Sequence, residues 1–354
     1  MLFIIDGSAL LTTHFFGNMP IEIMKEKDVN IQNEMAKTLL ERDNQGRYTN
    51  GISSMLYYIL DLINIYKPEQ MIIAFDKSHN TFRKELYENY KAQRNEKMAA
   101  LKEQFINMPK ILSYIGIPAI ASNKFEADDL AGSVVKHFYN DTDKIILLTK
   151  DHDWFQLLND KTECWMIYNN AEKALEKREK YSFIPQNNFN DFSQQPLPEK
   201  IAIFNKEAVR LEEGVNYNQI PDIKGLSGDK SDNIPGVPKV GPKTAANLLN
   251  AFGSVENIYS QIHNTSDLEQ LKADWKKLYK VQNTQFDNLV EYEDQALLST
   301  KLATIVTAIN IPGNLEKYNI NINKDNLERI VDSFNLEEIG YDFLNRSKDF
   351  TKEI

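Results

Sequence analysis

The sequence predicts an α/β fold with a parallel-type central sheet, and three observations lead to this prediction. Three short apolar runs have the length and composition of buried strands: residues 2–5, 71–75 and 145–149. Helix-length segments lie between these runs, which gives the β-α-β alternation of a sheet covered on both faces. Each run delivers an acid at or just after its end: Asp6, Asp76 and Asp151. Because ligands bind beyond the carboxyl ends of the strands in such sheets, we expect these acids to converge.

The composition indicates a globular chain of a reducing compartment. The chain has 354 residues, 42% of them hydrophobic, and a single cysteine, Cys164, which excludes an internal disulfide. It has no charged-then-apolar leader and no apolar run of membrane-spanning length, so we expect a soluble, cytoplasmic protein of a bacterial or virus-infected cell, with no membrane partner. The net charge is −10, but setting aside nine acids expected to face a metal leaves 42 acids against 41 bases. Basic patches for a polyanionic partner therefore remain possible.

Further acids extend the group at the expected sheet edge. They are Glu126, Asp128, Asp129, Asp153, Asp229 and Asp232. Taken singly they have ordinary explanations, since acids in a first helical turn offset the helix dipole and an acid at a strand end often only makes a turn. Together, so many carboxylates would raise one another's pKa unless cations neutralised them. Oxygen ligands without a histidine or cysteine cluster favour Mg²⁺ or Mn²⁺ over zinc.

A basic segment over residues 81–94 follows Asp76 closely and is predicted to be helical. At about 100° per residue, one face of this helix would carry cations and aromatic rings together: Arg83, Tyr87, Tyr90 and Arg94, with Lys84 and Lys91 on the flank. A solvated amphipathic helix with its tyrosines against the core is the structural alternative. The position of the basic segment beside Asp76, an expected metal ligand, favours the other interpretation: a surface that guides a single nucleic-acid strand.

A glycine-punctuated stretch over residues 225–241 combines acids with a turn that can approach an anion closely. The glycines at 225, 228, 236 and 241 are predicted to let the backbone take positive φ. A helix is predicted to start at Pro242, and its free N–H groups would point at a phosphate backbone. The stretch therefore predicts a metal site joined to a nucleic-acid clamp.

These motifs, in this order, make the sequence resemble the 5′-nuclease family, which includes the nuclease domain of bacterial type I DNA polymerases, stand-alone 5′–3′ exonucleases and flap endonucleases. The matching pieces are residues 75–76, 81–94, 126–129, 149–153 with 156–158, 228–237 and 298–305. The resemblance implies a PIN-like nuclease core over residues 1–205, with a helical arch spanning about 78–108. It implies a second unit over residues 206–354, with a helix-three-turn-helix DNA-binding module around residues 234–249 that completes the metal site.

The resemblance also implies roles for the residues that match. One divalent ion would be held mainly by Asp6, Asp76, Glu126 and Asp128, and a second would be held or shaped by Asp129, Asp151, Asp153, Asp229 and Asp232. Lys91 would face the scissile phosphate, Arg83 and Arg94 would steer the 5′ strand, and Lys84, Tyr87 and Tyr90 would contact DNA. The duplex backbone would be gripped without sequence readout, with a K⁺ ion nearby, by Gly236, Val237, Lys239, Gly241 and Lys243.

The function implied is a metal-dependent 5′–3′ exonuclease and flap endonuclease, acting as a monomer in replication or repair. Its substrates would be DNA with 5′ flaps, 5′ overhangs or nicks, and RNA primers, and its products would carry 5′-phosphates and 3′-hydroxyls. A PIN-type ribonuclease would explain the strand-end acids but would leave the clamp and the basic segment without a role. A catalytically silent junction-binding relative would be expected to lack some of the carboxylates.

Three features depart from the family pattern. Residues 17–45 are an insertion with two helix-like stretches, 21–27 and 33–41, which would extend a wedge for duplex DNA or dock a partner. Residues 169–200 are a second insertion, expected to form a solvated helix over 172–180 and a loop over 185–198. Lys150 stands where relatives usually carry a small residue.

Overall fold

A six-stranded sheet forms the centre of the protein, as seen in a computed structural model that describes residues 1–78, 81–94, 96–183 and 197–334. The strand order is β3-β2-β1-β4-β5-β6, and every neighbouring pair is parallel except β5 with β6. The strands are β1 (Leu2–Asp6), β2 (Gln70–Asp76), β3 (Ala119–Ser122), β4 (Ile145–Thr149), β5 (Thr162–Ile167) and β6 (Ile201–Phe204). The three predicted strands, which are β1, β2 and β4, are confirmed, and the predicted parallel-type sheet carries one antiparallel edge strand.

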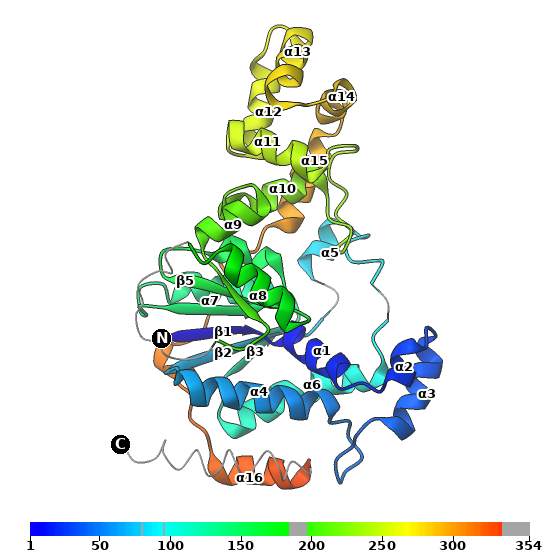
Figure 1. The fold of residues 1–354 in the computed structure, drawn as a ribbon, viewed down its shortest axis with the longest axis vertical. Helices are drawn as coiled ribbons and strands as arrows, with labels where there is room; N and C mark the ends of the chain where they lie inside the picture. The colour runs from blue at the N-terminus through cyan, green and yellow to red at the C-terminus, as the bar shows by residue number, and fades with distance from the viewer. Residues whose placement is uncertain (79–80, 95, 184–196, 335–354) are drawn as a thin grey trace.

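Helices cover both faces of this sheet because the central strands are apolar on both sides (Figure 1). On one face, Phe3 and Ile5 pack against α4 (Asn50–Tyr66) and α6 (Ala99–Ile115), which lie in the helix-length segments expected between the strands. On the other face, Leu2 and Ile4 pack against α7 (Ala127–His137) and the short helix η1 (His152–Leu157). Helix α1 (Gly7–Gly17) leaves β1 directly and packs on α4.

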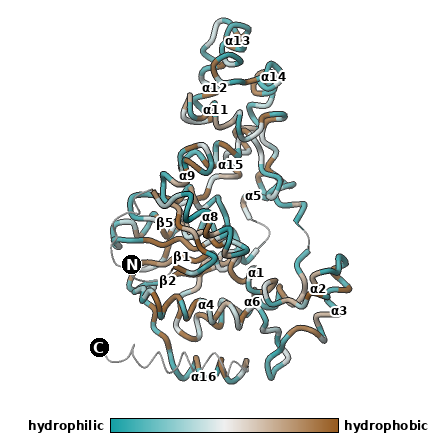
Figure 2. The backbone as a smooth tube through the Cα atoms, in the orientation of Figure 1, coloured by the Kyte–Doolittle hydropathy of each residue, from teal (hydrophilic) through white to brown (hydrophobic). Residues whose placement is uncertain are grey.

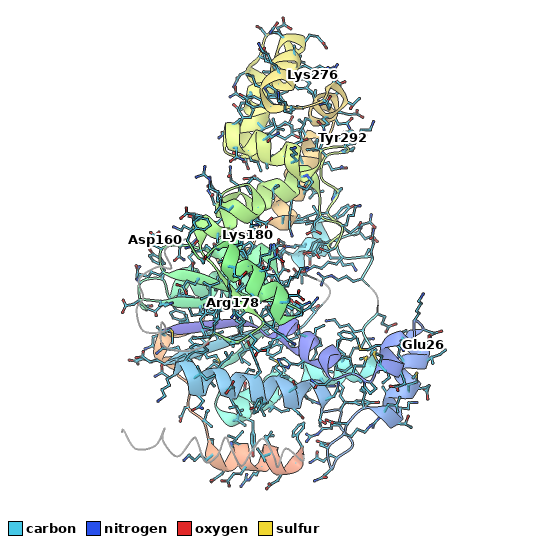
Figure 3. All side chains as sticks on the ribbon, viewed as in Figure 1. Glu26, Asp160, Arg178, Lys180, Lys276 and Tyr292 are labelled. Carbon is cyan, nitrogen blue, oxygen red and sulfur yellow. The ribbon has the colours of Figure 1, made fainter. Side chains whose placement is uncertain are left out.

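A tower of helices rises from the sheet and shares its core (Figure 1). Its elements are α9 (Lys206–Glu213), η2 (Tyr217–Gln219), α10 (Ile220–Ser227), α11 (Pro242–Phe252), α12 (Val255–Asn264), α13 (Leu268–Tyr279), α14 (Asn283–Glu291) and α15 (Glu293–Ala303). The predicted helix start at Pro242 is confirmed, and proline suits this first position because it has no N–H to satisfy. Lys276 on α13 and Glu26 beside α2 mark two extremities of the molecule (Figure 3).

After α15 the chain returns to the sheet. Helix η3 (Leu315–Tyr318) lies beside β2, and α16 (Lys324–Ser333) packs on α6 through Leu327 and Val331. The end of the second predicted unit therefore packs against the first. The division of the chain near residue 205 stays a prediction.

The insertion at residues 17–45 contains two helices, α2 (Ile21–Lys25) and α3 (Val29–Leu39), near the two helix-like stretches. A small apolar cluster of its own attaches it to the start of α6, and it includes Phe15, Ile23, Leu40 and Leu101. Figure 2 shows that this hairpin mixes apolar and polar residues along its length.

In the second insertion, α8 (Ala171–Lys180) confirms the predicted helix. Arg178 on α8 donates hydrogen bonds to the backbone carbonyls of Ile201, at 2.6 Å, and of Pro198, which tie the helix to β6 (Figure 3). Most of the loop expected over residues 185–198 lies outside the described residues.

The predicted continuous helix over residues 81–94 is wrong. Helix α5 (Phe82–Leu86) ends where Tyr87 takes an extended conformation, and turns follow, with Lys91 at a φ of +55°. The reason lies in the anchoring of the segment: the Lys91 N–H donates to the Asp232 carbonyl at 2.9 Å, while Arg83 and Tyr90 are both buried. One straight helix would not bring all three residues to these partners.

Across the described ranges, no helix is both long enough and apolar enough to cross a membrane.

Candidate active site

The ends of the central strands meet at one point, as predicted, and hydrogen bonds connect them. Asp6, at the end of β1, caps α1 by accepting the Ala9 N–H at 2.8 Å and also accepts the Thr149 hydroxyl at the end of β4, at 2.8 Å. Asp76, at the end of β2, accepts the Ala127 N–H at the start of α7, at 2.9 Å. Asp6 and Asp76 are thus held by backbone and hydroxyl donors.

One cavity of about 830 Å³ is lined by Asp6, Asp76, Asp128 and Asp151, here called the first group. Asp151, expected at the second cation site, takes the place expected for Glu126, which is paired with Lys91 instead. Burial raises the pKa of Asp6 to about 7, and repulsion from Asp76 and Asp151 adds to the shift. Burial and the charges of Asp151 and Asp6 also raise the pKa of Asp128 well above its usual range. No ion pair within the described ranges neutralises any of the four.

A second group of acids is neutralised by basic side chains. Lys91 Nζ lies 2.9 Å from Glu126 Oε2 and 3.6 Å from Asp232 Oδ2, and Arg94 lies 2.7 Å from Asp232 Oδ1. Burial lowers the pKa of Lys91, but the charges of Glu126 and Asp232 outweigh it and raise that pKa above its ordinary value. Lys91 and Arg94 therefore stay cationic in the lining of the cavity.

Lys224 is a site residue that sequence reasoning missed. It lies near the end of α10, forms an ion pair with Asp153, and places its ammonium 2.6 Å from Asp229 Oδ2. Burial lifts the pKa of Asp153 to about 7 with a contribution from Asp151, and Lys224 only partly offsets the rise. Asp229 is five residues after Lys224 and lies beyond the end of α10, so helical spacing does not indicate this contact.

The structure corrects the roles given to Arg83 and Asp129. Both side chains are buried, and two guanidinium nitrogens of Arg83 lie 2.7 Å from the two carboxylate oxygens of Asp129. Arg83 also donates to the carbonyls of Leu302 and Thr304, each at 2.8 Å. With these groups engaged, the pair joins α5 and α7 to the end of α15 and has a structural role in this conformation, in place of strand steering and metal ligation.

The other predicted DNA contacts of the basic segment differ in exposure: Tyr90 is buried, whereas Lys84 and Tyr87 are half-buried. Tyr90 is buried, and its hydroxyl lies 3.2 Å from Glu126 and 3.3 Å from Asp232, so its ring does not present a face for base stacking. Burial, then the charges of Glu126 and Asp232, raise the pKa of Tyr90. Lys84 and Tyr87 are half-buried, which leaves them partly accessible.

The glycine-rich stretch forms a closed turn. Asp229 and Ile234 exchange two backbone hydrogen bonds, at 2.9 and 2.8 Å, and a Cβ on Gly236 would lie 2.1 Å from the Gly228 nitrogen. Gly228 and Gly236 have positive φ as predicted, whereas Gly225 lies within α10 and Gly241 caps α11 at a φ of −94°.

Not all of the predicted clamp faces outward. The N–H groups of Gly236 and Val237 are used internally, by Ser299 Oγ at 3.0 Å and the Leu226 carbonyl at 2.7 Å. Lys239 and Lys243 are exposed, and Gly241 lies between them, half-buried. The accessible part of the clamp is therefore the stretch from Lys239 to Lys243.

The first group of acids fits a hard divalent cation by its donor chemistry, since it offers only carboxylate oxygens and carries uncompensated negative charge. In the described part of the chain, no three acidic, histidine or cysteine side chains stand ready as a coordination sphere. Coordination would therefore require these carboxylates to turn toward a common point.

Comparison with known proteins adds sequence and fold relatives. Residues 1–184 match the family model of a 5′-3′ exonuclease N-terminal resolvase-like domain, and residues 215–326 match that of a 5′-3′ exonuclease C-terminal SAM fold. A 5′-3′ exonuclease of Buchnera aphidicola subsp. Baizongia pistaciae is 34% identical over 270 residues, covering 76% of each chain. DNA polymerase I of Bacillus subtilis is 29% identical over 99% of this chain, which spans 34% of that protein.

The solved structure of T5 5′-exonuclease with bound zinc is similar in fold, with a TM-score of 0.57, 21% identity, and coverage of 98% of this chain and 99% of that one. The catalytic core of Rad2 in complex with a DNA substrate has a TM-score of 0.53 at 15% identity and covers 97% and 92% of the two chains. These likenesses support the mixed α/β fold.

Proposed function

Because the chain belongs to the 5′–3′ exonuclease family and is thus a nuclease, we propose that it hydrolyses phosphodiester bonds near the 5′ ends of DNA strands, with a divalent cation, as an exonuclease and a flap endonuclease. The observation that carries this proposal is the group of four aspartates from separate elements, which line one cavity together with Lys91 and Arg94. Uncompensated carboxylates beside fixed cations suit a reaction that brings together a hard metal ion and a phosphodiester.

The chain's own residues would divide the work. Asp6, Asp76, Asp128 and Asp151 would hold Mg²⁺ or Mn²⁺, which when bound activates water and stabilises negative charge on the phosphoryl group. Lys91 would bind a non-bridging oxygen of the scissile phosphate, because its ammonium is held beside the acids and stays charged. Asp153, Asp229 and Asp232, which Lys224 and Arg94 now neutralise, would contribute to a second cation site.

The substrates we propose are DNA with 5′ flaps, 5′ overhangs or nicks, and RNA primers, cut to leave 5′-phosphates and 3′-hydroxyls. The stretch from Lys239 to Lys243 would hold the duplex through its phosphates, and a K⁺ ion there stays part of the proposal. The protein would act as a monomer in replication or repair. Among its relatives, both a stand-alone 5′-3′ exonuclease and longer DNA polymerases carry this region.

The test is cleavage of a labelled 5′-flap duplex in Mg²⁺ and in excess EDTA, beside a matched single-stranded RNA. We expect cutting near the flap junction only with the metal. Asp151→Asn should reduce the rate by at least about a hundredfold, which is the order of effect of losing a transition-state contact. Asp160→Asn is the matched control, because Asp160 is 85% exposed and lies at the edge of the protein (Figure 3).

Other outcomes would redirect the assignment. Binding of the flap duplex without cutting would indicate a silent junction-binding protein. Preference for the RNA strand would indicate a PIN-type ribonuclease. An Asp151→Asn variant that cuts at the normal rate would exclude the first group of acids as the metal site.

A further inference from the structure

The cavity that holds the first group of acids extends well beyond them. Besides the four aspartates, its lining includes Lys91, Arg94 and Lys97 on one side and Lys150, Asn169 and Lys200 on the other. Helix α1 follows β1, the strand between β2 and β4, and contributes Ser8, Thr12, Thr13 and Phe16 to the lining. The cavity therefore continues from the acids as a trough with basic residues on two walls and mixed polar and apolar residues of α1 between them.

The wall formed by Lys150 and Lys200 takes no part in the proposed chemistry. Lys150 follows β4 and directly precedes Asp151, while Lys200 directly precedes β6. The Lys200 carbonyl accepts the Tyr168 N–H at 2.8 Å, and Lys150 Nζ donates to Asn169 Oδ1 at 2.7 Å. These two contacts hold the lysines beside consecutive residues, so the edge formed by β4, β5 and β6 brings them together.

Neither ammonium is neutralised by the part of the chain that the structure describes. No ion pair joins Lys150 or Lys200 to a described carboxylate, although Asp151 is the next residue to Lys150. Both lysines line the same cavity, and so do Tyr168 and Asn169, the residues that hold them.

Two uncompensated cations on one wall of an open trough suit an anion, and the trough's position indicates which one. No lining residue in the described ranges comes from residues 225–252, so the trough is separate from the stretch between Lys239 and Lys243. A strand whose scissile phosphate sits at the acids and whose duplex part lies on the clamp would continue along this trough. In an enzyme that cuts near 5′ ends, that continuing part is the 5′ side of the cut.

We propose that Lys150 and Lys200 form a binding site for backbone phosphates of the single strand on the 5′ side of the cut. This inference rests on the proposed nuclease function and extends it, because it makes cleavage depend on nucleotides that are released. A backbone phosphate would lie between the two ammonium groups, with the Asn169 amide as a neutral neighbour, and binding would be independent of base identity. A phosphate placed there would keep the strand in line with the acids.

The main alternative is that the lysines only moderate the negative charge of the nearby acids. In that case, removing them would change cleavage of all substrates by a similar factor. The phosphate site instead requires an effect that grows with the length of the single strand beyond the cut, and this difference makes the proposal testable.

The experiment compares Lys150→Ala/Lys200→Ala with the unmodified protein on two duplexes in Mg²⁺. One carries a 5′ flap of six nucleotides, and the other has only the terminal nucleotide beyond the cut. We expect kcat/KM to fall about tenfold or more on the flap, the size of removing one charge-assisted hydrogen bond, and by less than about twofold on the short substrate. Lys110→Ala is the control, since this lysine is exposed on α6 outside the trough.

A chemical substitution in the substrate identifies the phosphate directly. Uncharged methylphosphonate linkages are placed one at a time on the 5′ side of the cut, and at least one is expected to slow the unmodified protein but not the double variant. In EDTA, the slope of log affinity for a flap strand against log salt should fall by about 0.7 for each phosphate that the double variant no longer neutralises.

Equal losses on the two duplexes, or methylphosphonate effects that persist in the double variant, would overturn the phosphate site while leaving the nuclease assignment intact. Failure of the unmodified protein to cut either duplex would instead refute the proposed function. Circular dichroism and the thermal midpoint of the double variant confirm that any loss comes from the site and not from unfolding.

Discussion

Replacing Arg83 with alanine should destabilise the protein strongly, because Arg83 is the centre of a buried ionic contact. Its guanidinium makes two contacts of 2.7 Å with Asp129 and two hydrogen bonds of 2.8 Å to backbone carbonyls, with side-chain exposures of 3% for Arg83 and 0% for Asp129. Removing one partner of such a pair leaves a buried charge unpaired and costs about 3–5 kcal/mol. With an m value of about 3 kcal/mol per molar, a loss of about 4 kcal/mol lowers the urea midpoint by about 1.3 M.

The assay is urea unfolding followed by circular dichroism, for Arg83→Ala, Asp129→Ala and the double variant. The double variant should lose less free energy of unfolding than the two single variants combined, with a coupling energy of about 1–3 kcal/mol. The reason is that the second substitution removes a charge that the first has already left without a partner. Lys84→Ala, one residue along and half-buried without an ion pair among the described residues, should stay within about 0.5 kcal/mol. An Arg83→Ala protein of normal stability that binds DNA poorly would refute this reasoning and would support the predicted role of Arg83 in steering the 5′ strand.

Four further outcomes follow from the geometry. Asp153→Asn should abolish cleavage while leaving duplex affinity within about twofold by fluorescence anisotropy, since removing a proposed metal ligand removes chemistry and not phosphate contacts. Lys239→Ala should weaken duplex binding and reduce its salt slope by about 0.9, and an unchanged slope over several salt concentrations would contradict the clamp. The pKa of Asp6 and of Asp153 is about 7 against an ordinary 3.8, so protons compete with the metal and the Mn²⁺ affinity measured by calorimetry should fall from pH 8 to pH 6. Over the same fall in pH the metal-free protein should become more stable to urea, because the folded state binds these protons more tightly than the unfolded state. Gln104→Leu should lose about 2–3 kcal/mol in urea unfolding, because Gln104 Oε1 accepts two buried N–H groups of α4, at 2.9 and 3.0 Å.

The central strands were predictable because their sequences carry the signal of burial on both faces. Strands β1, β2 and β4 are continuous apolar runs, and every residue of β1 and β4 is buried. Strand β3 gives a weaker signal, since it has four residues, none of them fully buried. Strand β6 follows the polar insertion and pairs antiparallel with β5, so it has no β-α-β spacing to indicate it.

The roles of individual side chains were less predictable than their types. The positions of Arg83 and Tyr90 on one face of an expected helix indicated a shared exposed surface, but both are buried by partners that lie far away in the sequence. Such long-range contacts have no local pattern, and they override the helical preference of the segment. Lys224 was missed for the same reason: its two acidic partners come from different parts of the chain, one of them 71 residues earlier by position, at Asp153.

The way in which each group of acids is neutralised implies an order of cation binding. Asp153 and Asp229 already share the ammonium of Lys224, whose charge helps lower the pKa of Asp229 to about 2 even though burial opposes that shift. A divalent cation at this second group has to compete with an internal cation. The first group has no such competitor among the described residues, and repulsion between its acids contributes to the raised pKa of Asp6, so a cation relieves unfavourable charge there. The first group should therefore fill before the second, and arrival of a phosphate, which would attract Lys91 and the cations together, is the step that can complete the second site.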